Sequence, residues 1–260
     1  MNTVADMGIH AEPKTRTDQC ETHGPFEAKC FIGSIWSKCP TCSAETAARE
    51  KAENEAKERD DRRQAWQRKI GDAGIPERFQ NRSLQSFIAE TEAQARALEF
   101  ANGYADSFDQ ALATGRSVLF IGKPGTGKTH LAVGVGLRIM HRDSRTVLFT
   151  TVMRAIRRVK DTWNRESTES ETQAIAALVF PDLLILDEVG VQFGSDTEKL
   201  ILFDVLNERY EKRRPTLLLS NLALDDVKAY LGERVFDRLR EDGGEAIPFD
   251  WASWRGRVVA

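Results

Sequence analysis

Residues 122–129 read GKPGTGKT and fit the pattern G-x-x-x-x-G-K-[ST] at every fixed position. A strand-like apolar run, SVLFIG, precedes the motif, and a helix-forming segment follows it. Glycines at this spacing let backbone N–H groups curl around phosphate oxygens, and the start of the next helix adds its positive end. The match and both flanks argue against a chance glycine-rich turn. The motif therefore requires a strand–loop–helix unit that binds phosphate.

Other apolar runs repeat this alternation of strand and helix. Strands are predicted over 117–122, 146–151, 182–190, 215–221 and, more weakly, 245–250. One helix is predicted over 90–114 before the first of them. Continuous apolar strands separated by helix-length segments indicate an α/β fold, in which helices cover both faces of a parallel sheet.

The rest of the chain divides into two smaller zones. Residues 1–43 hold all four cysteines, and 44–73 form a charged helix and linker ahead of a nucleotide-binding domain over 74–260. The helix is predicted over 43–70, rich in Ala, Glu, Lys and Arg, with Ser43 as its N-cap. It has too few apolar residues for a coiled-coil seam, so we expect a solvated helix.

Composition excludes several classes of protein. The net charge of −3 argues against wholesale nonspecific nucleic-acid binding, although a local basic patch remains compatible with it. No apolar run approaches the roughly 20 residues of a membrane span, and the N-terminus lacks an apolar signal core. We therefore expect a cytoplasmic protein with no membrane partner.

The nucleotide site can be assigned from the motif and from the run LLILDEVG. Lys128 would contact the phosphates and Thr129 would offer a hydroxyl to Mg²⁺. Asp187 would hold Mg²⁺ either directly or through a ligand of the ion, and Glu188 would polarise an attacking water, which favours hydrolysis over transfer. The alternative is an acidic loop after a strand. The residues expected to bind ATP or ADP are Gly122, Pro124, Gly125, Thr126, Gly127, Lys128, Thr129, His130 and Asp187.

The cysteines suggest a structural zinc site. Cys20-x-x-His23 and Cys39-x-x-Cys42 are two short pairs that can close a tetrahedral site with no open position. Cys30 could replace His23, but only through one long-range pairing, so His23 is preferred. Two disulfides are a further alternative, which the expected cytoplasmic setting disfavours.

Four segments carry a family resemblance. GKPGTGKTHLA, LLILDEVGVQ, TLLLSN and GERVFDRLR together resemble the DnaC family of bacterial replicative helicase loaders, which are AAA+ ATPases close to the transposition helpers called IstB. The likeness covers about 74–259, and GIPERF is similar to the family's lead-in. It implies an AAA+ domain with an abbreviated lid, because only 39 residues follow Asn221.

The resemblance also assigns roles to individual residues. Asn221 maps to the residue that senses the γ-phosphate, although a turn-forming Asn is the alternative. Arg238 maps to an arginine finger that reaches a neighbouring subunit, with Arg234 as its rival, and either arginine could instead pair with a nearby acid. Arg255 maps to a second sensor that acts within its own subunit.

The segment 152–178 is longer than one crossover helix needs. In the resembling clade an extra helix here faces single-stranded DNA. Arg154, Arg157 and Arg158 share one helix face, with Lys160 close by, and such a patch can track a phosphate backbone. A solvated basic face is the alternative.

These observations favour a helicase loader that uses ATP, Mg²⁺ and Zn²⁺. Its expected partners are a hexameric replicative helicase, held through the N-terminal region, single-stranded DNA, and further copies of itself. The N-terminal zinc module is similar to phage or prophage versions of the family. The alternative is an IstB-like transposition helper. A small-molecule kinase would lack a lid, and a nonhydrolysing zinc adaptor would not explain Lys128, Asp187 and Glu188 together.

Overall fold

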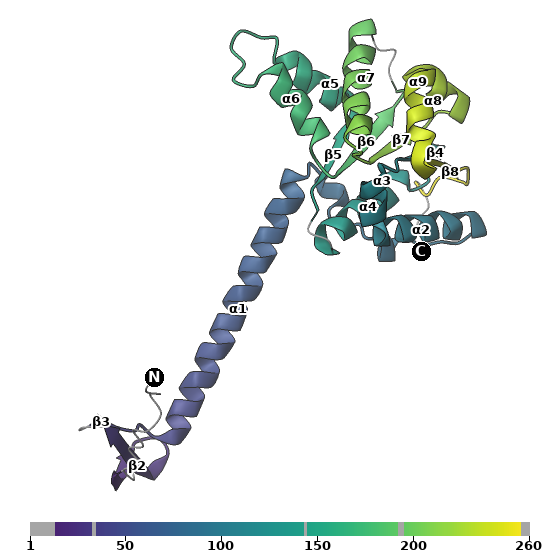
Figure 1. Ribbon diagram of the computed structural model, residues 1–260. Helices are drawn as coiled ribbons and strands as arrows, with labels where there is room; N and C mark the ends of the chain where they lie inside the picture. Colours follow the sequence, from purple (N-terminus) through teal and green to yellow (C-terminus); the bar gives the residue numbers. More distant parts are fainter. Residues whose placement is uncertain (1–13, 33–34, 143–144, 192–194, 256–260) are drawn as a thin grey trace, which may run out of the picture. The chain divides into compact units, whose positions relative to one another are not determined.

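The computed structural model describes residues 14–32, 35–142, 145–191 and 195–255. It divides the chain into two compact units, Met1–Gln67 and Arg68–Ala260 (Figure 1). Each unit is described by itself below. Among the described residues, no helix combines the length and the apolar character needed to cross a membrane.

The first unit is a small antiparallel sheet followed by most of a long helix. The sheet has the order β1-β2-β3, and its strands are β1 (Lys14–Cys20), β2 (Gly24–Ile32) and β3 (Ile35–Trp36). The guanidinium of Arg16 lies 4.3 Å from the centre of the Trp36 ring, a cation–π contact across the sheet.

Helix α1 (Pro40–Asp72) begins earlier than the sequence suggested. The prediction that Ser43 caps this helix is wrong, because the helix starts at Pro40. Proline suits the first turn of a helix, where a backbone N–H has no partner within the helix. This start places Cys42 on the helix. Ile70 is the only buried residue of α1, which fits the solvated helix expected from its composition. In the second unit, the Lys69 Nζ donates to the Met140 carbonyl at 2.9 Å.

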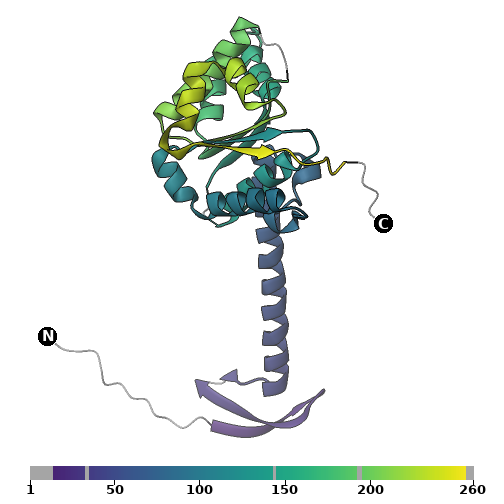
Figure 2. The same ribbon diagram turned by 90° about the vertical axis from the view of Figure 1, so that its right-hand side faces the viewer.

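The second unit is a five-stranded sheet between two layers of helices (Figures 1 and 2). The order is β5-β6-β7-β4-β8 and every neighbouring pair is parallel. The strands are β4 (Val118–Gly122), β5 (Val147–Thr151), β6 (Leu183–Val189), β7 (Thr216–Ser220) and β8 (Glu245–Phe249). All five predicted strands are therefore present, and the α/β fold is confirmed.

Helices of two different kinds cover the two faces. One face carries α2 (Glu92–Asp106) and α4 (Lys128–Arg142). The other carries α5 (Val152–Asp161), α6 (Glu171–Val179), α7 (Asp196–Glu211), α8 (Leu224–Leu231) and α9 (Glu233–Arg240). Leu184, Leu186 and Leu218 point from the sheet into the apolar core beneath this second group. Successive strand residues alternate between the faces, which is why strands covered on both sides read as continuous apolar runs.

The single helix predicted over 90–114 is two helices. The break falls at Ser107, whose φ of −105° and ψ of 23° lie outside the helical region, and α3 (Phe108–Thr114) follows it. The backbone N–H and the hydroxyl of Ser107 both donate to the Gly103 carbonyl, at 3.0 and 2.7 Å. The change of direction lets Phe108 be completely buried.

Arg209 ties α7 to the ends of its neighbours. This side chain is fully buried, and its guanidinium donates to the carbonyls of Leu178 (3.0 Å), Val179 (2.7 Å) and Pro181 (3.0 Å) and to the Thr216 hydroxyl (2.9 Å). Burial lowers its pKa to about 9. The carbonyls at the end of α6 thus obtain the donors that a helix C-terminus lacks.

Candidate functional site

The loop between β4 and α4 depends on its glycines. Gly122 has a φ of 135° and Gly127 a φ of 98°, a region that side chains with a Cβ rarely adopt. A Cβ at Gly122 would lie 2.2 Å from the carbonyl oxygen of Phe249, and one at Gly127 would lie 2.6 Å from the ring of Phe87. Both positions of the motif therefore require glycine for space as well as for backbone conformation.

Lys128 begins α4 and is only 7% exposed. Its Nζ donates to the carbonyls of Gly122 and Lys123, at 2.7 and 2.8 Å. Burial lowers the pKa of Lys128 to about 8, which the Asp187 carboxylate opposes and the Arg255 guanidinium reinforces. A buried ammonium with so little opposite charge around it is suited to an anionic ligand.

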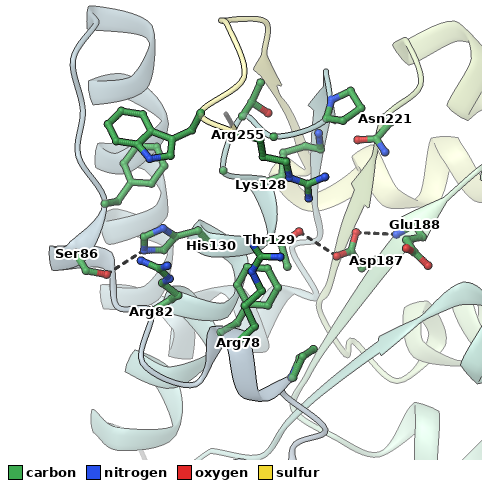
Figure 3. Close-up of a pocket in the computed structure, with 18 of the residues that line it drawn as sticks. Arg78, Arg82, Ser86, Lys128, Thr129, His130, Asp187, Glu188, Asn221 and Arg255 are labelled. Atoms are coloured by element: carbon green, nitrogen blue, oxygen red, sulfur yellow. Dashed lines mark hydrogen bonds between the residues drawn. The ribbon is translucent and has the colours of Figure 1, made fainter. Parts of the chain in front are cut away.

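The residues expected to hold Mg²⁺ lie side by side. The Thr129 hydroxyl donates to the Asp187 Oδ2 at 3.0 Å (Figure 3). Burial raises the pKa of Asp187, while its bonds to the Glu188 N–H and Thr129 and the charge of Lys128 act against that rise. A hydroxyl and a carboxylate at this spacing are ligand types that Mg²⁺ accepts beside nucleotide phosphates, so the donor set fits the ion.

Glu188 follows Asp187 in an unusual backbone conformation. Its φ is 61°, within the left-handed region, and the pairing register of β6 with β7 shifts between Leu186 and Val189. The side chain is exposed and lines the same pocket as Lys128. Strained backbone of this kind persists where the surroundings hold it and is common at functional sites.

These residues line one pocket of about 560 Å³ at the carboxyl ends of the strands (Figure 3). Its size suits a nucleotide-sized ligand. The lining residues that the sequence analysis had assigned to nucleotide or catalysis are Pro124, Gly125, Thr126, Gly127, Lys128, Thr129, His130, Asp187, Glu188, Asn221 and Arg255. Gly122 lies at the foot of the loop, at the end of β4.

The pocket also contains residues that sequence reasoning did not assign. The segment containing η1 (Glu77–Phe79) and η2 (Leu84–Ser86) closes one side of it. The unassigned lining residues from this segment are Pro76, Arg78, Phe79, Arg82, Ser86, Phe87 and Ile88. Trp251 and Trp254 add aromatic side chains from the C-terminal part. The GIPERF resemblance was the only signal available for the first group.

His130 fastens this lead-in segment to α4. Its Nε2 lies 3.0 Å from both the Ser83 carbonyl and the Ser86 hydroxyl, and its ring meets Phe87 edge-on at 5.4 Å (Figure 3). Burial lowers the pKa of His130, so the ring is neutral near pH 7. Because a carbonyl only accepts, Nε2 carries the hydrogen in the bond to Ser83.

Arg238 lies on α9 and does not line this pocket. Its guanidinium lies 4.8 Å from the centre of the Tyr210 ring, and its buried Nη1 has no hydrogen-bond partner among the described residues. Its rival Arg234 is exposed beside Phe203. Arg238 is therefore placed away from the nucleotide pocket of its own chain.

The four basic residues considered for DNA contact have different surroundings. Arg154 lines the nucleotide pocket. Arg158 pairs with Glu169 at 2.6 Å, and Lys160 pairs with Glu198 at 2.7 Å. Arg157 is exposed on α5. The patch thus carries less unpaired positive charge than its sequence implies.

A second candidate site lies in the first unit. The ligand atoms of Cys20, His23, Cys39 and Cys42 all lie within 4.8 Å of one another. The Cys20 and Cys42 sulfurs are 3.5 Å apart, and the His23 Nδ1 is 3.2 Å from the Cys42 sulfur. Ligands of a tetrahedral zinc ion lie about 3.5–3.8 Å apart, as follows from Zn–S and Zn–N bonds of about 2.3 and 2.0 Å. The arrangement fits zinc.

The surroundings of this cluster support the same assignment. The His23 Nε2 lies 3.2 Å from the Glu45 carboxylate, which would fix Nδ1 as the metal-facing nitrogen. Cys30 is buried in β2 and stands outside the cluster, and none of the four cysteines forms a disulfide.

Comparisons with known proteins agree with this geometry. Residues 41–241 match the family model described as IstB-like ATP binding protein. The replicative helicase loader DnaC of Escherichia coli K12 is 39% identical over 204 residues, which cover 78% of this chain and 81% of that protein. The uncharacterized protein YdaV of the same strain is 34% identical over 188 residues, covering 72% and 73%.

Solved structures show the fold. The crystal structure of the DnaC helicase loader matches with a TM-score of 0.60 at 24% identity, covering 66% of this chain and 99% of that one. The replication initiator DnaA bound to AMPPCP and single-stranded DNA matches with 0.56 at 18% identity, covering 68% and 51%. The second unit thus has the AAA+ fold that the resemblance implied, and the chain belongs to the IstB/DnaC family of ATP-binding proteins.

Proposed function

We propose that this protein is an ATP-dependent loader that places a replicative DNA helicase on single-stranded DNA. The observation that carries the proposal is its 39% identity to a replicative helicase loader across 81% of that protein. The nucleotide pocket supports it, because the phosphate-binding loop, Thr129, Asp187 and Glu188 line it together. Such a protein works in the cytoplasm.

The residues of the pocket would divide the work of hydrolysis. Lys128 and the loop amides would hold the phosphates, and Thr129 with Asp187 would hold Mg²⁺, which neutralises phosphate charge when bound. Glu188 would orient the water that attacks the γ-phosphate. Asn221 and Arg255 would contact the same phosphate from two sides of the pocket.

The remaining positive charge would come from another copy of the chain. Arg238 lies outside the pocket of its own chain, so an arginine finger at this position serves a neighbour's ATP. Hydrolysis would then require assembly into an oligomer. Contacts with single-stranded DNA would fall to Arg154 and Arg157, which are exposed on α5, and to Arg158 and Lys160 where their acidic partners give way.

The N-terminal unit would hold the helicase. Its four metal ligands fit Zn²⁺, which would supply the folding energy that so small a sheet lacks. An IstB-like transposition helper is less favoured, since the curated relatives of 35–39% identity are replicative helicase loaders.

The test is native-mass analysis of the protein mixed with its host's replicative helicase, ATP and Mg²⁺. The same mixture is measured with residues 1–67 removed, a cut that keeps Lys69 and its bond to Met140. A discrete complex that needs those residues is expected. No complex under any nucleotide condition would refute the loader and leave the transposition helper to be tested.

A further inference from the structure

The segment after β8 lies against the phosphate-binding loop. The indole Nε1–H of Trp251 donates to the Thr126 carbonyl at 2.9 Å, and the backbone N–H of Trp254 donates to the Gly125 carbonyl at 2.8 Å. Ser253 is so close that a Cβ at Gly125 would lie 2.0 Å from its hydroxyl oxygen. Two successive carbonyls of the loop are thus held from the same side.

Three further carbonyls of the loop also accept hydrogen bonds. Those of Gly122 and Lys123 accept from the Lys128 Nζ, and the Lys123 carbonyl accepts in addition from the Thr126 hydroxyl, at 2.8 Å. The Gly127 carbonyl accepts from the Leu131 N–H within α4. The bonds from residues 251 and 254 therefore complete a set in which these loop oxygens accept from protein donors.

These bonds fix the direction of the amides that matter for phosphate. In a trans peptide the C=O of one residue and the N–H of the next point in opposite directions. A Thr126 carbonyl held by Trp251 therefore turns the Gly127 N–H away from that segment. In the same way, the Gly125 carbonyl held by Trp254 fixes the Thr126 N–H. These N–H groups belong to the loop that would receive the β-phosphate.

Trp251 is itself held firmly. Its ring lies 4.8 Å from that of Phe249, which in turn lies 5.0 Å from Phe120 in β4. Strands β4 and β8 pair in parallel up to Gly122 and Phe249, directly before the loop and the C-terminal segment. The indole donor is therefore anchored to the same strand that ends in the loop.

We propose that Trp251 is a positioning residue of the nucleotide site, whose indole N–H orients the Thr126–Gly127 peptide so that its amide faces the β-phosphate. The inference rests on the proposed binding of ATP and names a group outside the phosphate-binding motif on which that binding depends. Because the same segment carries Arg255 to the pocket, Trp251 links the loop to the γ-phosphate contact.

The variant Trp251→Phe tests this role. Phenylalanine keeps an aromatic ring against Phe249 and removes the donor. Since one neutral hydrogen bond is involved, the dissociation constants of ADP and ATP are expected to rise by the same factor, between about twofold and tenfold. The measurement is calorimetric titration of each nucleotide with Mg²⁺, at a temperature where thermal unfolding shows the variant folded.

Trp251→His is the matched rescue. The five-membered ring of histidine places its Nε2 where the indole has Nε1, so the neutral imidazole offers a donor at the same point. It is expected to bind ADP more tightly than the phenylalanine variant at pH 8, where the imidazole is neutral and adds no charge of its own near the phosphates. Trp163→Phe is the control, because the Trp163 indole donates to Glu171 and lies outside the pocket. The dissociation constants of ADP and ATP are expected to stay unchanged in this variant.

The outcomes separate the claims. If Trp251→Phe binds ADP and ATP as tightly as the unmodified protein, the positioning role is overturned. This holds even if the melting temperature of the variant is lower. Loss of ATP affinity with ADP unchanged overturns it too, since it assigns the effect to Arg255 alone. Failure of the unmodified protein to bind either nucleotide would instead refute the proposed function.

Discussion

Among single residues, Glu188 has the position and the freedom needed for the chemical step. It is exposed and lines the pocket that also contains the Thr129–Asp187 pair. Glu188→Gln keeps the size of the side chain and removes its basicity. ATP turnover is expected to fall by about a hundredfold or more while ATP affinity stays within about twofold. Glu92→Gln, on the exposed start of α2, serves as the control in the same steady-state assay.

The pKa of Lys128 leads to a prediction of how nucleotide affinity depends on pH. Its pKa is about 8 in the free protein, and a phosphate beside it stabilises the charged form, so the bound pKa is higher. The complex then holds more protons than the free protein, and affinity must fall as pH rises through the interval between the two pKa values. The dissociation constant of ADP is expected to be flat from about pH 7 to 7.5 and to rise above about pH 8.

Lys128→Arg provides the comparison for that titration. Arginine remains charged throughout the range, so the rise in the dissociation constant above pH 8 should disappear even if the overall affinity is lower. An equally steep rise in this variant would assign the pH dependence to a different group.

Much of the second unit could be predicted from the sequence. Phosphate binding requires fixed spacing within one loop, so Gly122, Gly127 and Lys128 are visible without any structure. Asp187 lies beside Thr129 because parallel strands deliver their carboxyl ends to the same edge of the sheet. The same rule explains Arg154, which follows β5 and lines the nucleotide pocket.

Other features had no local signal. Phe87 lies 40 residues before Gly127, and Trp251 lies 125 residues after Thr126. Neither segment has a periodic pattern that indicates contact with the loop. The start of α1 at Pro40 was missed because Ser43 offered a capping residue, whereas in the structure Cys39 and Cys42 at the helix start lie close to His23. Tertiary contacts decided both cases.

At the scale of elements, the N-terminal sheet and the start of α1 meet at the metal cluster. Cys42→Ser removes one of four ligands, and Cys30→Ser removes a thiol outside the cluster. Zinc content is expected to be one ion per chain in the unmodified protein and in Cys30→Ser, and to fall sharply in Cys42→Ser after dialysis against a chelator. The measurement is metal analysis of the purified full-length chains. Loss of zinc in Cys30→Ser alone would exchange the roles of Cys30 and His23.

For the whole molecule, the proposed arginine finger at Arg238 would make the active unit larger than one chain. The arginine rests on Tyr210, with a buried nitrogen that has no partner among the described residues, and it lies outside the nucleotide pocket. An unpaired buried donor is costly, so movement of the Arg238 side chain out to a phosphate of another copy would relieve that cost. Arg255, in contrast, lines the pocket of its own chain. The two arginines should therefore behave differently when chains are mixed.

Mixing two inactive variants distinguishes these roles. Glu188→Gln keeps the arginine finger Arg238 but cannot hydrolyse ATP in its own pocket. Arg238→Ala keeps its own pocket intact but has no arginine finger. In a mixed oligomer, an interface between the finger of the first and the pocket of the second is complete, so turnover is expected to rise well above that of either variant alone. Arg255→Ala mixed with Glu188→Gln should show no such recovery, because neither chain then carries a complete pocket. Recovery in both mixtures, or in neither, would contradict a finger acting between chains, provided that native-mass analysis shows the mixed oligomers. Recovery of turnover only in the mixture of Arg238→Ala with Glu188→Gln would place the catalytic unit at the contact between two copies, since neither chain can complete the site by itself.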